Sequence, residues 1–195
     1  GVGNDIKALD KGINKAAKGI AIGTIAIGAG AIMVGKSFID AGAEVEKYKT
    51  TLTTMLGSVD LANKRFEEMS KFAASTPFEL NEVVALGNQL QALGMYSKEN
   101  MTLLGDLSAA AGKPIDQVTG AFAKLVSGQK GEAVNMFRDL LISTKDWTAA
   151  TGKGIKKSGE LMATTDEMIA ALPKILAAKG FTGMMNNLSK TNEGI

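Results

Sequence analysis

The chain of 195 residues contains neither cysteine nor histidine. Their absence excludes disulfide bonds, thiolate and imidazole metal ligands, and catalysis by a cysteine nucleophile or a Ser-His-Asp triad. The acidic, hydroxyl and lysine side chains that remain show no spacing typical of a catalytic or metal site. We therefore expect no catalytic residue, no cofactor, no metal, and a protein that is not an enzyme. The lack of cysteine is compatible with any redox compartment.

Proline is also scarce, with three residues in the chain, so long helices are permitted. Hydrophobic residues make up 45% and charged residues 22%, which is ordinary for a globular protein. The net charge of +2 is too small to indicate nucleic-acid binding by itself. Helical periods and helix-ending residues predict an all-α protein. We expect a long amino-terminal heptad helix over residues 1–57 and a compact multi-helix domain over 58–195, which we expect to continue beyond the last residue.

A seven-residue apolar repeat marks the first part of the chain. Its members are Ile6, Ile13, Ile20, Ile27 and Val34. A row of small residues lies opposite, at Gly12, Ala16, Gly19, Gly23, Ala26 and Gly30. Apolar heptads form a seam around a partner helix, and small residues let two backbones approach closely. The seven-residue register continues through Tyr48 and Met55. We therefore predict that this arm self-associates into a homo-oligomer.

The uncharged stretch of residues 19–35 permits a second interpretation. As a helix it spans about 25 Å, slightly less than the hydrocarbon core of a bilayer at roughly 30 Å. Glycine and alanine make it less apolar than an ordinary spanning helix. A membrane-active arm is therefore an alternative, and a cleaved signal peptide is less favoured because the heptad repeat runs through the segment.

The segment Gly30–Ser37 fits the pattern G-x-x-x-x-G-K-S of a phosphate-binding loop. In a true loop of this kind the backbone N–H groups hold phosphates, while the lysine and serine reach phosphate and Mg²⁺. Here the four intervening residues are apolar, and no later apolar run ends in an aspartate placed to hold the metal. Nucleotide binding remains an alternative function, and we expect it to be absent.

The second part of the chain contains regular signals for helix starts and ends. Thr76 is predicted to cap a helix, with Pro77 in its first position and Glu79 completing a capping box. Glycines at 94, 112 and 128 are predicted to end three helices, and Ser97 is predicted to begin the second of them. A further helix is expected over about 132–142. We interpret Trp147–Met162 as a loop anchored by a buried indole, and Thr165 as the cap of a last long helix that Pro173 kinks or splits.

Several of these segments resemble the tape measure domain of tailed bacteriophages and prophages. The most specific is Phe72–Leu80, with the sequence FAASTPFEL. The resemblance extends over Tyr48–Ile195 and includes helix ends at Leu107–Gly112 and Leu125–Gly128, and a closing region at Thr165–Lys190. One departure occurs at Leu141, where the family pattern has a glycine before the isoleucine.

The resemblance implies a structural component of the virion that lies in the lumen of the tail tube. Several copies, a trimer or a hexamer, would lie along the tube axis, set tail length during assembly in the host cytoplasm, and leave ahead of the DNA. The implied partners are the tail tube protein and the distal tail or baseplate proteins. Contact with DNA and with the host membrane during ejection is implied as well.

Overall fold

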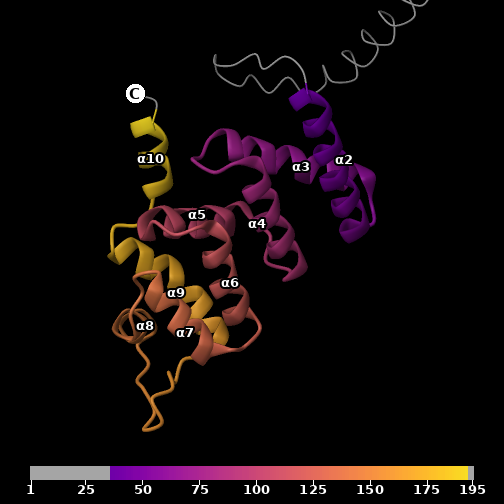
Figure 1. Cartoon of the computed structure of the whole chain (residues 1–195). Helices are drawn as coiled ribbons and strands as arrows, with labels where there is room; N and C mark the ends of the chain where they lie inside the picture. The colour runs from indigo at the N-terminus through magenta and orange to yellow at the C-terminus, as the bar shows by residue number, and fades with distance from the viewer. Residues whose placement is uncertain (1–35, 193–195) are drawn as a thin grey trace, which may run out of the picture. The chain divides into compact units, whose positions relative to one another are not determined.

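The computed structural model describes the backbone of residues 36–192 and the side chains of residues 45–190. Within residues 36–192 the regular elements are α-helices, and the one β-bridge, Ile155 with Leu161, is isolated. In chain order the helices are α2 (Lys36–Leu56), α3 (Val59–Ala74), α4 (Leu80–Ala92), α5 (Lys98–Ala111), α6 (Ile115–Val126), α7 (Lys130–Asp139), α8 (Thr144–Thr151), α9 (Thr165–Ala178) and α10 (Met184–Asn192) (Figure 1). The all-α prediction is therefore confirmed for this part of the chain.

The ends of α4 and α5 follow the glycine and serine signals in the sequence. Gly94 and Gly112 adopt φ angles of +67° and +60°, in the left-handed region that glycine enters without a Cβ clash. The hydroxyl oxygen of Ser97 accepts a hydrogen bond from the N–H of Asn100 at 3.0 Å and so caps α5. The helix start predicted at Ser97 and both predicted helix ends are confirmed.

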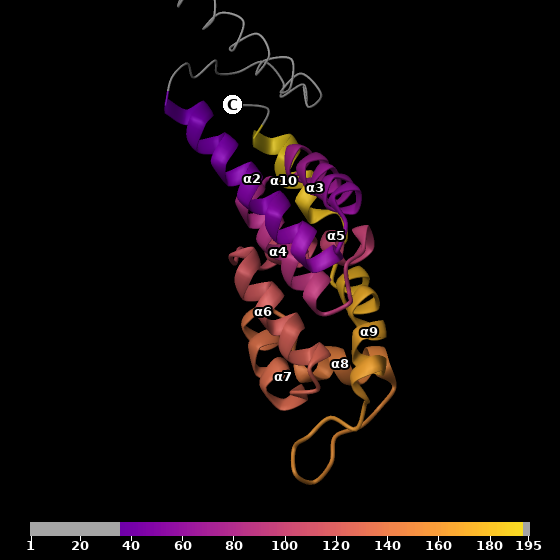
Figure 2. The same cartoon turned by 90° about the vertical axis from the view of Figure 1, so that its right-hand side faces the viewer.

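Helix α6 packs against four other helices, α4, α5, α7 and α9. Figure 2 shows it between α4 and α7. Its buried side chains include Val118, Phe122 and Leu125, each fully inaccessible to solvent. The buried hydroxyl of Thr119 donates to the carbonyl oxygen of Ile115 at 2.6 Å, so its polar group is paired within the helix. These apolar side chains form the face of α6 that contacts the neighbouring helices.

The segment after α7 differs from the expected loop. Residues 144–151 form α8, and Ser143 caps it by accepting a hydrogen bond from the N–H of Asp146 at 3.3 Å. Trp147 lies inside this helix, fully buried, and its ring meets the edge of Phe137 with a centroid distance of 5.4 Å. The buried indole was expected, but the loop prediction is wrong for residues 147–151, because a Ser-x-x-Asp capping box starts a helix that includes them.

Helix α7 ends three residues earlier than predicted, in a Schellman turn. The N–H of Ile142 donates to the carbonyl oxygen of Phe137 at 2.9 Å, and the N–H of Leu141 donates to that of Arg138 at 3.1 Å. Leu141 has a φ angle of +65°, and among the non-glycine residues described it alone has a positive φ. Ile142 is fully buried beside the turn, which explains why the chain turns at this position.

The cap of α9 is Thr164, one residue before the predicted Thr165. Its hydroxyl oxygen accepts from the N–H of Glu167 at 3.2 Å, and the Glu167 carboxylate accepts from the N–H of Thr164 at 2.8 Å. The helix continues through Pro173 without a break, so the predicted split is wrong.

The last turns of α2 belong to the compact unit that begins at Ala41. Leu52 is fully buried in the core, and the rings of Tyr48 and Phe66 stack with their centroids 6.5 Å apart. Residues 1–35 of the long heptad helix expected over 1–57 lie outside the described residues, so that helix and its boundary stay predictions.

Candidate functional site

The predicted oligomer seam, from Ile6 to Val34, and the opposing small-residue face, from Gly12 to Gly30, lie outside the described residues. Self-association of the arm stays a prediction. The first six residues of the phosphate-loop pattern also lie outside the described residues. Its last two, Lys36 and Ser37, are the first residues of α2.

The structure places Thr76, Pro77 and Glu79 between α3 and α4, in a different arrangement from the predicted cap. Thr76 completes the end of α3, where its N–H and its hydroxyl both donate to the carbonyl oxygen of Ala73, at 3.2 and 3.4 Å. Helix α4 begins only at Leu80, and Glu79 is its cap residue. The prediction of a Thr76 cap with Pro77 in the first helical position is therefore wrong.

The reciprocal bond expected of a capping box is nevertheless present, shifted by three residues. The N–H of Glu79 donates to the carboxylate of Glu82 at 2.9 Å. The N–H of Glu82 donates to the side-chain oxygen of Asn81 at 2.8 Å. Glu79 thus lies at the start of the box and not at its end.

A buried carboxylate joins two segments that are far apart in the sequence. Asp106, in the middle of α5 and 3% exposed, accepts hydrogen bonds from the N–H groups of Gly183 at 2.7 Å and Met185 at 3.0 Å. It therefore caps α10 from another helix, where it meets the partial positive charge of the helix amino terminus. Met185 of α10 is buried, and it packs over Gly105. The sequence contained one indication, an aspartate between apolar positions of an amphipathic helix, but nothing that identified its partner.

An open pocket of about 460 Å³ lies between α3 and the start of α5. Its walls include Arg65, Glu68, Phe72, Tyr96, Lys98 and Met101. The guanidinium carbon of Arg65 lies 3.7 Å from the centre of the Tyr96 ring, and its Nη1 lies 3.3 Å from the carboxylate of Glu68. The Tyr96 hydroxyl donates to the same carboxylate at 3.5 Å.

This cluster is suited to joining α3 to the segment before α5. The Arg65 cation is already stacked on a ring and paired with a carboxylate. Burial raises the pKa of the Tyr96 phenol, against the opposing effect of Arg65, so the phenol stays protonated at neutral pH and acts as a hydrogen-bond donor. Neither group is free to act as a base.

A second polar cluster connects α8 to the end of α9. The Asp146 carboxylate accepts from the N–H and the hydroxyl of Ser143, at 2.7 and 2.8 Å, and Lys179 lies 3.4 Å away. Partial burial tends to raise the pKa of Asp146, but the hydrogen bonds from Ser143 and the charge of Lys179 outweigh it, so the pKa is lowered. This arrangement stabilises a helix start.

No group of three or more acidic side chains in the described residues is placed to hold a metal ion. Among the helices of residues 36–192, none combines the length and apolar character required to cross a bilayer. Comparison of the chain with protein-family models, with curated proteins and with solved structures found no match.

Proposed function

We propose that the chain is part of a bacteriophage tail tape measure protein, a structural component that is not an enzyme. It would lie in several copies in the lumen of the tail tube, contact the tube and the distal tail or baseplate proteins, and set the length of the tail. At infection it would leave the tube ahead of the DNA.

The observation on which this proposal rests is the resemblance of Phe72–Leu80 to the centre of the tape measure domain. In this chain the segment runs from the end of α3 to the first residue of α4. Phe72 is buried at the end of α3, and Phe78 and Leu80 pack against the core. A segment with two aromatic anchors and a proline between two helices has a defined structural task, which restricts its sequence.

The turn at Leu141 agrees with the same resemblance. The family pattern has a glycine at this position, where the chain has leucine. The backbone there adopts a φ angle of +65°, the conformation that favours glycine at the end of a helix. The one departure from the pattern therefore coincides with a backbone geometry that suits the residue of the pattern.

The length of the tail tests the proposal. Deleting residues 13–26 from the full-length gene removes two heptads and keeps Ile6 and Ile27 in one seam. Because a helix advances about 1.5 Å per residue, the ruler should shorten by roughly 21 Å. Electron microscopy of the assembled tails should show this shortening, either as a whole ring of the tube or as a mixed population.

A deletion of residues 13–24 is the matched control, because twelve residues are far from a whole number of helical turns and the deletion therefore rotates the apolar seam out of register. It should reduce assembly as well as length. If tails with the in-register deletion keep the parental length distribution, the arm is not part of a ruler. The seam is tested separately by Ile20→Asp in the purified chain, where we expect the oligomer to be lost.

A further inference from the structure

The open pocket between α3 and the start of α5 has an apolar base. Phe72 and Met101 line it and are only 9% and 2% exposed, so they lie at its inner end. The ring of Tyr96 forms part of the wall. Aromatic rings and a methionine thioether make favourable contacts with an aromatic ligand. The volume of about 460 Å³ is typical of a small-molecule site, and it admits about fifteen non-hydrogen atoms if each occupies the roughly 30 Å³ of a water molecule.

The charges on the α3 wall of the pocket are already matched. Glu68 is the one carboxylate among the lining residues. It lies 3.3 Å from Nη1 of Arg65 and accepts a hydrogen bond from the Tyr96 hydroxyl at 3.5 Å, so its negative charge is compensated. Lys71 pairs with Glu67 at 2.6 Å, but both side chains are largely exposed, at 68% and 62%, and an ion pair of this kind contributes little. The α3 wall therefore presents no uncompensated negative charge that would repel an anion.

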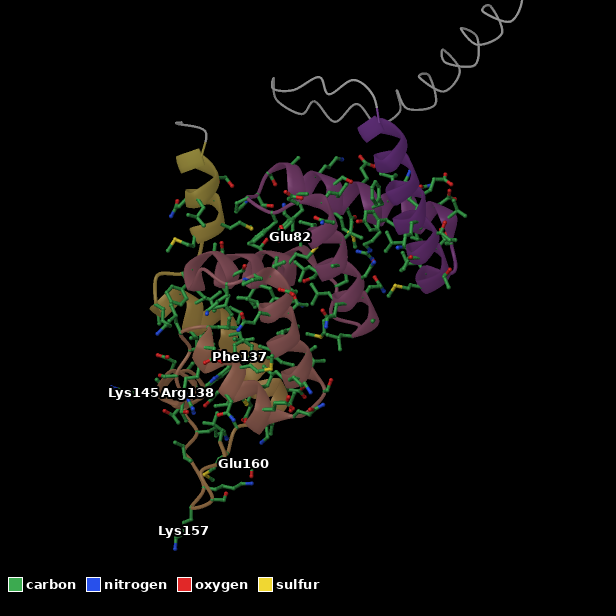
Figure 3. The ribbon with its side chains drawn as sticks, in the orientation of Figure 1. Glu82, Phe137, Arg138, Lys145, Lys157 and Glu160 are labelled. Atoms are coloured by element: carbon green, nitrogen blue, oxygen red, sulfur yellow. The ribbon has the colours of Figure 1, made fainter. Side chains whose placement is uncertain are left out.

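The α5 side of the pocket holds two donors that are not fully used. The Lys98 ammonium makes no ion pair within the described residues. The Ser97 hydroxyl accepts from the N–H of Asn100 at 3.0 Å and donates no hydrogen bond within residues 45–190, so its proton is available. Lys157 is another lysine without an ion pair in that part of the chain, but it points away from the helices (Figure 3) and does not line the pocket. At Ser97 and Lys98, a hydroxyl donor and a positive charge adjoin an apolar base.

We propose that this pocket binds a small carboxylic acid with an aromatic body, in its ionised form. The aromatic group lies against Phe72 and Met101, and the carboxylate accepts hydrogen bonds from the Lys98 ammonium and the Ser97 hydroxyl. A few polar groups that orient a ligand above a mostly apolar lining are typical of small-molecule sites. Two donors match the two oxygens of a carboxylate, whereas a phosphate would leave further oxygens unpaired above an apolar base. This inference does not depend on the tail function proposed above.

Titration of the full chain with 3-phenylpropionate, followed by nuclear magnetic resonance, is the direct test. We expect a Kd on the order of a few millimolar, which is what the ligand efficiency of ordinary small ligands gives for an acid of this size. The methyl signal of Met101, assigned with Met101→Leu, should shift because the aromatic ring of the ligand lies against it. The signal of Met168, which is fully buried in α9, should not shift.

The role of the charge is tested with a matched ligand and a matched variant. 3-Phenylpropanamide keeps the ring but lacks the charge, so it should bind about two- to fivefold more weakly, the range expected for an exposed ion pair. Lys98→Gln should weaken binding of the acid by the same factor and leave binding of the amide unchanged. Lys113→Gln removes another exposed lysine, just beyond the other end of α5, and should change neither.

Three results would overturn the proposal. The first is a Met101 methyl signal that does not move during the titration. The second is equal binding of the acid and the amide to the parent chain. The third is an equal effect of Lys98→Gln and Lys113→Gln on binding of the acid. Circular dichroism of both lysine variants should match that of the parent, since both replace exposed side chains.

Discussion

Leu141 offers a sharp test of the argument that links sequence to backbone. It occupies the residue after the cap of α7, with a φ angle of +65° and about half of its side chain exposed, at 52%. Two variants, Leu141→Gly and Leu141→Ala, remove nearly the same side-chain atoms and differ only in the Cβ atom. The difference between them therefore isolates the strain of an L-residue in this conformation.

The magnitude follows from two opposing effects. A Cβ atom in the left-handed region costs about 1–2 kcal/mol. Glycine loses more backbone entropy on folding, which costs about 0.5–1 kcal/mol relative to alanine. We therefore expect Leu141→Gly to be more stable than Leu141→Ala by about 0.5–1 kcal/mol. At Leu61, which is 54% exposed and lies inside α3, the order should reverse, with glycine about 1 kcal/mol less stable than alanine.

Urea denaturation of the four variants, followed by circular dichroism, gives the required free energies of unfolding. A change in midpoint at constant slope reports the stability difference. If alanine proves equal to or better than glycine at position 141, the residue is not strained. The support that this turn lends to the tape measure proposal would then be lost.

Four further results are expected. Asp106→Asn should weaken the docking of α10 by about 2 kcal/mol, because an amide cannot accept from both N–H groups as the carboxylate does. Hydrogen exchange of the α10 amides should then rise about 30-fold. Asp139→Asn, an exposed control with the same charge change, should leave this exchange rate unaltered. Thr164→Ala should cost about 1 kcal/mol in urea denaturation whereas Thr164→Ser should not, and equal stability of the two would contradict the cap. The pKa of Asp146 is held below its ordinary value of 3.8, so the stability that its carboxylate contributes is complete above about pH 4 and is lost as pH falls through the lowered pKa. Asp146→Asn should therefore reduce the loss of stability on acidification, and an unchanged loss would refute this contribution. Millimolar MgATP should not shift the melting temperature, and a rise of several degrees that Lys36→Ala abolishes would favour the nucleotide-binding alternative.

The features that the sequence predicted correctly are those set by neighbouring residues. Gly94 and Gly112 end helices because a left-handed residue closes the last turn, and Ser97 starts one because its oxygen reaches an N–H three residues later. Each of these interactions spans fewer than six residues, so its partners are visible in a short window of sequence.

The wrong assignment at Thr76 arose because two helix termini compete for one segment. A Thr-Pro pair followed by glutamate favours a helix start, but Thr76 is still bonded to the last turn of α3 through its N–H and its hydroxyl. Phe78 packs against the core before α4 begins. Tertiary contact of this aromatic side chain therefore overrides a local preference that amounts to about 1 kcal/mol.

Non-local pairs could not be predicted from the sequence for a different reason. Asp106 and Gly183 are separated by 77 residues, and Arg65 and Tyr96 by 31. Which carboxylate meets which helix terminus, and which cation stacks on which ring, depends on how α5 packs against α10 and how α3 lies beside the start of α5. No short pattern contains that information.

The support for the tape measure proposal consists of helix ends, at Phe72–Leu80 and at Leu141, and such features restrict a fold more than an activity. The proposed ruler function must therefore be tested in the arm, by the in-register deletion of residues 13–26 and its out-of-register control.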